Sequence, residues 1–135
     1  MPKFLDLRTS EQSNTDTSTL AVPVGAGAAV VIGDIGLVTT GFAGQIRVSL
    51  QGYAKVTTTT AGSTLTYQVV RNGALIFTTT LTAVTAGEQD LGGFTAADLP
   101  PAPASGLIQY QLLVFASAAG ITLGARAFTG VAASD

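Results

Sequence analysis

Apolar and polar residues alternate strictly between positions 45 and 56 (QIRVSLQGYAKV). Ile46, Val48 and Leu50 occupy every second position, with polar side chains between them. Successive side chains of a β-strand point to opposite faces, so this pattern predicts a strand with one buried face. From Ala21 onward Val, Ile, Thr, Phe and Tyr dominate, and Gly or Pro recurs roughly every eight to fifteen residues. Together these features predict an all-β domain.

The dipeptide Asn72-Gly73 lies between two apolar runs and predicts a β-hairpin. Both central residues of a tight type I′ turn need positive φ, which Asn and Gly adopt most readily. The turn then pairs apolar residues across the hairpin, Val69 with Ile76 and Val70 with Leu75. These two pairs lie on opposite faces, so we expect both faces of the sheet to be covered, by a second layer or by a neighbouring molecule.

A similar two-sided pattern recurs near the end of the chain, where residues 107–116 and 121–132 flank a turn at SAAG. Between the two hairpins, LGGFTAADLPPAPASG predicts one long connection without strands, with at most one helical turn before Pro100. A connection of this length suits a crossing between two sheets. With about eight antiparallel strands after residue 20, the sequence predicts a jelly-roll β-sandwich for residues 21–135.

The composition excludes several classes of function. Charged residues make up 10% of the chain, against roughly 25% in a typical soluble domain. The net charge is −2 without a basic cluster, which argues against a nucleic-acid partner, and no apolar run reaches the ~18 residues of a membrane span. From a composition this apolar we expect that copies of the protein partly cover one another's surface. We also see no secretory signal at the N-terminus.

Residues that support catalysis or metal binding are scarce. The chain has no Cys and no His, so thiolate sites and Ser/His/Asp chemistry are excluded. The segment VGAGAAVVIGDIG has two glycines of a nucleotide-binding fingerprint but lacks the third, and it favours a strand. The carboxylates that remain as candidates are Glu88, Asp90, Asp98 and Asp34, and their spacing favours a solvated loop over a calcium site. We therefore expect no enzymatic activity, no metal and no cofactor.

Threonine runs and arginines leave narrower questions open. The threonines at 57–60 and 78–82 favour neutral strand surfaces, and a carbohydrate site using Tyr53 or Tyr67 is the less favoured alternative. Arg71 precedes the Asn-Gly turn, which predicts an exposed position at a strand end. Arg126 lies in an otherwise uncharged strand. We therefore expect it to pair with a carboxylate, either in the same chain or in the N-terminal segment of another chain.

Residues 1–20 differ from the rest, because they carry many of the charges and few apolar side chains. We interpret them as an N-terminal arm with a short strand at FLDLRT and a polar tether at 10–19. Ten extended residues span about 33–36 Å, close to the ~36 Å diameter of a domain this size. The arm is expected to contact another subunit through Phe4, Leu5, Leu7 and Arg8, by adding to a sheet edge. The alternative is packing on its own domain.

Three segments carry a resemblance to a known family: VSLQGYAKV, STLTYQVVRNGALI and the final stretch LPPAPASGLIQYQLLVFASAAGITLGARAFTGVAAS. Over roughly residues 28–134 the chain resembles jelly-roll subunits of bacterial spore surfaces. These include TNF/C1q-like exosporium domains and subunits of endospore appendage fibres. In appendage subunits an N-terminal connector reaches the next subunit, often through cysteines. This chain has none, so any such link is non-covalent.

The sequence and the resemblance together imply a structural role. We expect a non-enzymatic subunit that self-assembles into a fibre or shell on the surface of a spore or, alternatively, a phage virion. The expected partner is the chain itself, with an anchoring surface protein as a second candidate, and the expected location is extracellular. The alternative function is a trimeric TNF/C1q-like head that binds a receptor or a glycan.

Overall fold

The computed structural model describes residues 2–83, 85–87, 89–103 and 105–135, and only the backbone of Asp90 and Leu91. The described residues form nine strands and one 3-10 turn. In chain order these elements are β1 (Lys3–Ser13), β2 (Leu20–Ala21), η1 (Ala26–Ala28), β3 (Val30–Val38), β4 (Ile46–Thr58), β5 (Thr64–Arg71), β6 (Ala74–Thr82), β7 (Gln89–Asp98), β8 (Leu107–Ala116) and β9 (Ile121–Ser134).

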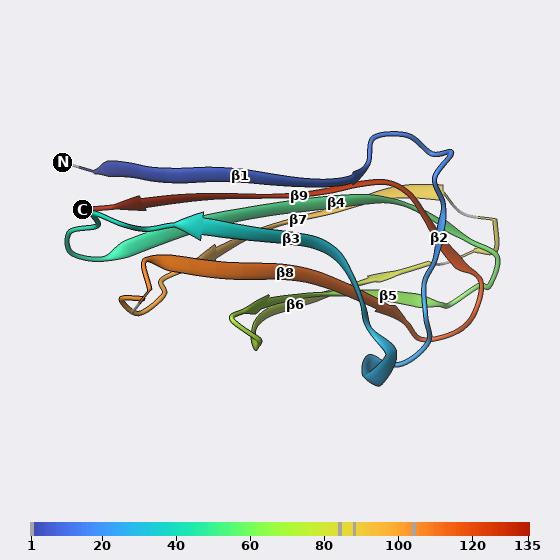
Figure 1. Ribbon diagram of the computed structural model, residues 1–135. Coiled ribbons are helices and arrows are strands. Elements are labelled where there is room, and N and C mark those ends of the chain that lie inside the picture. Colours follow the sequence, from blue (N-terminus) through green and yellow to red (C-terminus); the bar gives the residue numbers. More distant parts are fainter. Residues whose placement is uncertain (1, 84, 88, 104) are drawn as a thin grey trace.

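The strands form two layers that face each other (Figure 1). One sheet has the order β1-β9-β4-β7, with the short β2 also paired to β9, and the other has the order β3-β8-β5-β6. All pairings between these strands are antiparallel. Strands far apart in sequence lie side by side, as β4 and β9 do, which is the arrangement of a jelly roll. The predicted jelly-roll β-sandwich is confirmed, and the count exceeds the eight strands expected after residue 20 because β1 joins the sandwich.

The core lies between the two sheets and is built by alternating residues. Ile46, Val48 and Leu50 are buried, and the residues between them are exposed, as the pattern predicted. The largest fully buried side chains are Tyr67, Tyr110 and Phe128. Burying a large apolar side chain contributes roughly 1.5–3 kcal/mol, so these inward faces supply most of the driving force for folding.

Aromatic rings close one long side of the sandwich, where β7 faces β5 and β6. The Phe94 ring centroid lies 5.3 Å from that of Phe77 and 5.6 Å from that of Tyr67. The Tyr67 hydroxyl donates a hydrogen bond of 3.0 Å to the Gly92 carbonyl. Phe128 extends the cluster toward β3, where Gly33 is required because a Cβ there would lie 2.6 Å from the Phe128 Cβ. Ring packing therefore joins the two sheets on this side.

The segment 89–98 corrects the expected long connection. It forms β7, which pairs with β4 over ten residues, and no helical turn is present there. Pairing with the long β4 gives this Gly-rich segment a ladder of backbone hydrogen bonds, which outweighs its weak strand propensity. The connection between the sheets is therefore shorter and begins at Leu99. Among the described residues, no helix has the length and apolar character needed to cross a membrane.

The hairpin turn between β5 and β6 is confirmed at Asn72 and Gly73, whose φ angles are 47° and 86°. Val70 pairs with Leu75 as expected. Val69 pairs with Phe77 and not with Ile76, because the register shifts by one residue on β6. A β-bulge of this kind places two residues opposite one and changes which side chain faces the core.

Gly73→Val is expected to lower the free energy of unfolding by more than about 1 kcal/mol, because a β-branched residue strongly resists positive φ. Urea denaturation of the purified variant measures the change. Gly27→Val is the matched control, since a Cβ there meets nothing within 4 Å and its φ is not positive. Equal losses in both variants would contradict the proposed strain.

Candidate assembly surface

Residues 3–13, which we expected to reach another subunit, form β1 at the edge of the chain's own five-stranded sheet (Figure 1). Nine register pairs join β1 to β9, from Lys3 opposite Ser134 to Ser13 opposite Arg126. This corrects the predicted arm. The short strand expected at FLDLRT is present, but it extends to Ser13 because the open edge of β9 supplies backbone partners within the same chain.

Side chains of β1 also bridge to β3, the edge strand of the opposite sheet. Three side chains reach β3 and the residues after it: Lys3 Nζ donates to the Gly41 carbonyl (2.8 Å), Asp6 Oδ2 accepts from the Val38 amide (2.8 Å) and Ser10 Oγ accepts from the Asp34 amide (3.1 Å). As the β1 residue number rises, the partner's number falls step for step, which is an antiparallel register. We call this line of contacts the seam. It closes the second long side of the sandwich with side chains where a barrel would use backbone bonds.

The four predicted contact residues separate into two pairs. A bulge between Phe4 and Asp6 turns Leu5 inward, where it packs against the core. Arg8 forms an ion pair of 2.9 Å with Asp6. Phe4 and Leu7 face outward and are 65% and 52% exposed. These last two are the apolar members of the set that face outward, because the bulge places the apolar residues of β1 on opposite faces, and the Arg8 side chain is exposed as well.

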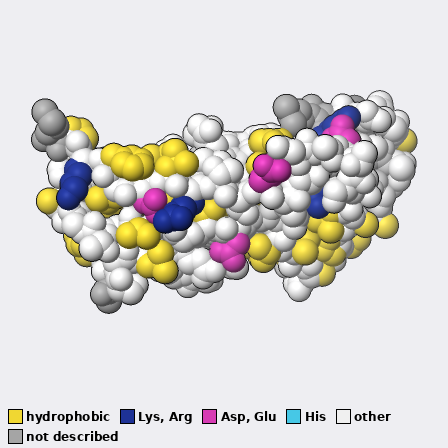
Figure 2. Space-filling view, turned by 45° about the horizontal axis from the view of Figure 1, so that its top comes forward, with side chains coloured by type: hydrophobic (Ala, Val, Ile, Leu, Met, Phe, Trp, Pro, Cys, Tyr) yellow, Lys and Arg dark blue, Asp and Glu magenta, His cyan; other side chains and the backbone are white. Residues whose placement is uncertain are grey.

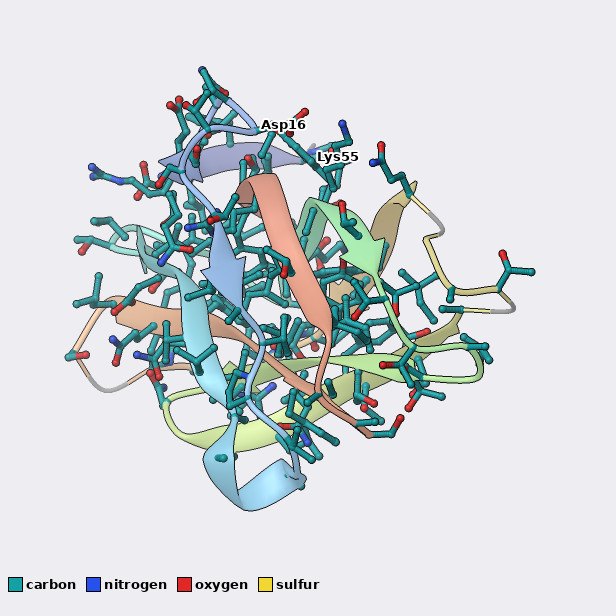
Figure 3. All side chains as sticks on the ribbon, turned by 90° about the vertical axis from the view of Figure 1, so that its right-hand side faces the viewer. Asp16 and Lys55 are labelled. Atoms are coloured by element: carbon teal, nitrogen blue, oxygen red, sulfur yellow. The ribbon has the colours of Figure 1, made fainter. Side chains whose placement is uncertain are left out.

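Residues 14–19, expected to be a tether, lie against the body of the protein. Asp16 Oδ2 accepts a hydrogen bond of 2.8 Å from Lys55 Nζ, and its Oδ1 accepts from the Ala125 amide at 3.1 Å. Figure 3 shows Asp16 and Lys55 directed toward each other across the end of the molecule. Gly124 allows this approach, since a Cβ there would lie 2.6 Å from Asp16 Oδ1.

The Arg126 side chain also binds the N-terminal segment. Neutral oxygen atoms accept its hydrogen bonds in place of the carboxylate partner that the sequence predicted. The buried guanidinium donates to Gln12 Oε1, to the Ser18 carbonyl at 2.8 Å and to the Gly124 carbonyl at 2.7 Å. Burial lowers the pKa of Arg126 from its ordinary value. An arginine nevertheless stays protonated in a folded protein, so the N-terminal segment supplies most of the acceptors for a buried charge.

Stability is expected to fall as the pH drops below about 4, because two aspartates fasten the N-terminal segment. The hydrogen bond from the Val38 amide, followed by that from Arg8, lowers the pKa of Asp6. The hydrogen bond from Lys55, followed by that from Ala125, lowers the pKa of Asp16. A lowered folded-state pKa stabilises the protein above the unfolded pKa, and the effect is lost as the pH falls through the folded value.

Urea midpoints measured from neutral to acid pH check this expectation. Asp6→Asn should be less stable than the wild type at neutral pH and nearly equal to it in acid. Parallel pH profiles for the variant and the wild type would contradict the role of Asp6.

The outer face of the five-stranded sheet, directed away from the other sheet, carries rows of paired side chains. Leu7, Val131, Ser49 and Ala97 form one row across β1, β9, β4 and β7. Phe4 pairs with Ala133 in the next row. We define the apolar end patch as Phe4, Leu7, Val131 and Ala133. Figure 2 shows hydrophobic side chains scattered over both halves of this view of the molecule.

A cluster that sequence reasoning missed joins β7 to the opposite sheet. Arg71 Nη1 contacts both carboxylate oxygens of Asp98, at 2.7 and 2.8 Å, and the Tyr110 hydroxyl donates to Asp98 Oδ2 at 2.8 Å. We call these three residues the clamp. Arg71 ends β5 as expected, but its side chain is only 24% exposed because it turns toward Asp98. Burial, and then the hydrogen bond to Asp98, raise the pKa of Tyr110, which therefore stays protonated and acts as a donor.

The clamp is a structural link between the two sheets, made of an ion pair and a hydrogen bond. Asp98 is fully engaged, and Asp34 accepts hydrogen bonds from the side chains of Gln109 and Gln111. Glu88 and the side chain of Asp90, two of the four carboxylate candidates, lie outside the described residues. Within the described part, no group of three or more His, Cys, Asp or Glu residues stands close enough to hold a metal ion.

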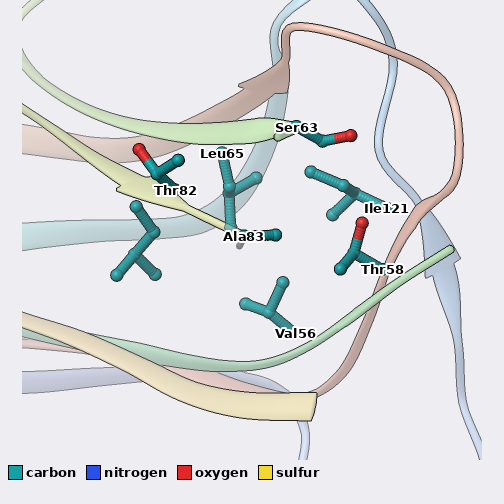
Figure 4. A pocket seen from close by; sticks show the side chains of 8 residues that line it. Val56, Thr58, Ser63, Leu65, Thr82, Ala83 and Ile121 are labelled. Atoms are coloured by element: carbon teal, nitrogen blue, oxygen red, sulfur yellow. The ribbon is translucent and has the colours of Figure 1, made fainter. Parts of the chain in front are cut away.

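A small pocket between the sheets, at the end formed by β4, β5, β6 and β9, has a volume of about 30 Å³ (Figure 4). Val56, Leu65 and Ile121 line it with apolar groups. The hydroxyls of Thr58 and Ser63 both donate to the Thr60 carbonyl. The pocket is far below the ~300 Å³ of typical small-molecule sites and is best described as a packing defect.

Comparison with known proteins supports the fold and leaves the family open. No protein-family model matches the chain, and no curated protein sequence matches it. Solved structures do match. VP2 in a subviral particle of infectious bursal disease virus has a TM-score of 0.58 at 14% identity, covering 96% of this chain and 32% of that one. The chain thus spans about a third of the length of the VP2 structures it matches.

Two further structures share the fold. The Eiger TNF of S. frugiperda has a TM-score of 0.50 at 12% identity, and the match covers 96% of this chain and 92% of that chain. Dimeric latent PorU from Porphyromonas gingivalis has a TM-score of 0.51 at 13% identity, with 96% of this chain and 13% of that chain covered. At these identities the likeness establishes a jelly-roll fold shared with viral and TNF proteins.

Proposed function

We propose that this protein is a non-enzymatic structural subunit that self-assembles into a fibre or shell on the surface of a spore or virion. The observation that carries the proposal is the apolar end patch. Phe4 and Leu7 protrude from β1 beside Val131 and Ala133 on β9, with their apolar side chains exposed. Removal of such a surface from water is favourable, and a second copy of the chain presents the same surface.

The N-terminal segment keeps its proposed role in this account, although it stays in its own sheet. It joins subunits through the outward Phe4 and Leu7, while Leu5 packs against the core of its own domain. The absence of cysteine from the sequence makes the contact non-covalent. A chain with only 10% charged residues has little like-charge repulsion between copies, which favours close association.

The compared structures support an assembling surface protein. The VP2 structures come from subviral and T=1 particles, so a jelly roll of this kind serves there as a particle subunit. The sequence resemblance adds spore-surface fibres as a second setting. In either setting the partner is the chain itself, with an anchoring surface protein at the base, and the location is extracellular.

Replacing both Phe4 and Leu7 with serine is expected to raise the protein concentration needed for assembly by about ten- to a hundredfold, because each subunit contact loses two buried apolar side chains. Light scattering and negative-stain microscopy of the purified protein measure the effect. Leu75→Ser with Leu107→Ser is the matched control, since these leucines are also exposed but lie on the other sheet. A wild type that stays monomeric at high concentration would refute the proposal.

A trimeric TNF/C1q-like head that binds a receptor or glycan is the second candidate function. One observation favours it: the match to the Eiger TNF covers 92% of that chain, so the two domains have nearly the same extent. The same light-scattering measurement separates the candidates. A discrete particle with the mass of three chains supports the head, whereas fibres or large shells support the structural subunit.

A further inference from the structure

The outer face of the five-stranded sheet contains a shallow hollow with a volume of about 580 Å³. It lies in the middle of the sheet, and its lining residue Thr129 is two positions along β9 from Val131 of the apolar end patch. Side chains two positions apart on a strand point to the same face, so the hollow adjoins the patch on the outer face. The volume falls within the range of about 300–1,000 Å³ that small-molecule sites occupy.

The hollow exists because Tyr53 has small neighbours on both sides in its row of the sheet. Ala127 on β9 pairs with Tyr53 on β4, and Tyr53 pairs with Gly93 on β7. Gly93 has no side chain, so its backbone forms the floor of the hollow. A Cβ at this position would lie 3.3 Å from the Gly52 carbonyl oxygen and 3.8 Å from the Tyr53 Cβ. The neighbouring Gln51, Thr95 and Thr129 form the wall.

The groups around this floor are uncharged and available to a ligand. Tyr53 exposes about a third of its surface (36%). Within the described residues, the side chains of Gln51, Tyr53 and Thr95 make no hydrogen bond, whereas the Thr129 hydroxyl contacts that of Thr9 at 3.3 Å. An amide and two hydroxyls thus surround an aromatic ring, and each of them can both donate and accept.

We propose that this hollow binds a neutral saccharide. The Tyr53 ring offers an apolar face for the C–H groups of a sugar ring, while its hydroxyl reaches water and ligand together. Gln51 and Thr95 supply the paired donor and acceptor groups that sugar hydroxyls require. A charged ligand would meet no opposite charge among the lining residues. The site does not depend on assembly, although an array of copies would multiply a weak single-site affinity by about 10²–10⁴.

Isothermal titration calorimetry tests the proposal, with cellotriose, mannotriose and chitotriose as neutral probes and trigalacturonate as an acidic one. We expect at least one neutral trisaccharide to bind at one site per subunit, and trigalacturonate to show no binding. Tyr53→Ala should weaken that binding by about tenfold, the value of one aromatic contact. Gly93→Thr should abolish it by filling the floor. Ser49→Ala, on the same strand and face but outside the hollow, should bind like the wild type.

Urea midpoints and light scattering of every variant separate the outcomes. If no neutral trisaccharide binds, or if Tyr53→Ala binds like the wild type, the proposal is wrong. If the two hollow variants change particle mass and no saccharide binds, the hollow is a subunit contact and the proposal is equally wrong. A protein that stays monomeric and binds saccharide would refute only the proposed self-assembly. A protein that assembles and binds no saccharide would refute only the proposed saccharide site.

Discussion

Replacing Asp98 with alanine is expected to lower the free energy of unfolding by about 2–4 kcal/mol. Asp98 accepts from Arg71 and from Tyr110 at 2.7–2.8 Å, and its side chain is 10% exposed. Its removal leaves a guanidinium and a buried hydroxyl without their acceptor. Breaking a fully buried ion pair costs about 3–5 kcal/mol, and the partial exposure of Arg71 reduces that figure.

Urea denaturation at neutral pH measures this effect, and two variants locate its source. Tyr110→Phe removes only the neutral donor and should cost about 1 kcal/mol. Asp34→Ala removes an exposed carboxylate that also accepts two side-chain hydrogen bonds, so it controls for general charge removal. A loss below about 0.5 kcal/mol for Asp98→Ala, the usual range of surface substitutions, would show that the clamp does not hold β7 to the other sheet.

Deleting residues 1–19 is expected to destabilise the protein by about 3–5 kcal/mol and to cause aggregation. The deletion removes β1 and exposes the edge of β9, which then presents unpaired backbone groups to other chains. It also removes two of the three acceptors of the buried Arg126 guanidinium, at Gln12 and Ser18. The sequence had predicted a jelly roll formed by residues 21–135, whereas the structure makes β1 part of that sandwich.

A synthetic peptide of residues 1–19 provides the decisive control for the truncation. Added to the truncated protein, it should restore solubility and the urea midpoint, because the edge of β9 and the Arg126 guanidinium regain their partners. A scrambled peptide of the same composition should do neither. A truncated protein that unfolds at the wild-type midpoint would show that β1 adds nothing to stability.

Elements whose burial follows from their own residues could be predicted from the sequence. The alternation of Ile46, Val48 and Leu50 identified β4, and Asn72-Gly73 identified the hairpin turn. Each depends on a short-range rule, namely the two-residue period of a strand and the positive φ of a tight turn. The fold class followed from many such signals that agree.

Elements that depend on partners distant in sequence could not be predicted. The sequence indicated a short strand at FLDLRT within β1 but not its partner, because the position of β1 is set by the β9 edge and by the seam to β3. Arg71 and Asp98 are separated by 27 residues, and the segment before Asp98 has the Gly content of a loop. The candidate surface was therefore half predicted: Phe4 and Leu7 face outward, and the bulge that turned Leu5 inward leaves no mark in the sequence.

The pairing of Lys3 with Ser134 brings the two ends of the chain together at one end of the sandwich (Figure 1). Domains with adjacent termini tolerate circular permutation and insertion into a host protein, because joining the ends requires only a short linker. A permutant opened between Asn72 and Gly73 would begin at an exposed turn and keep β1 covalently beside β9. In that form the N-terminal strand becomes an internal hairpin strand, so its pairing no longer depends on a loose chain end. The same adjacency makes the domain suited to display from a single attachment point, with the opposite end of the sandwich directed outward.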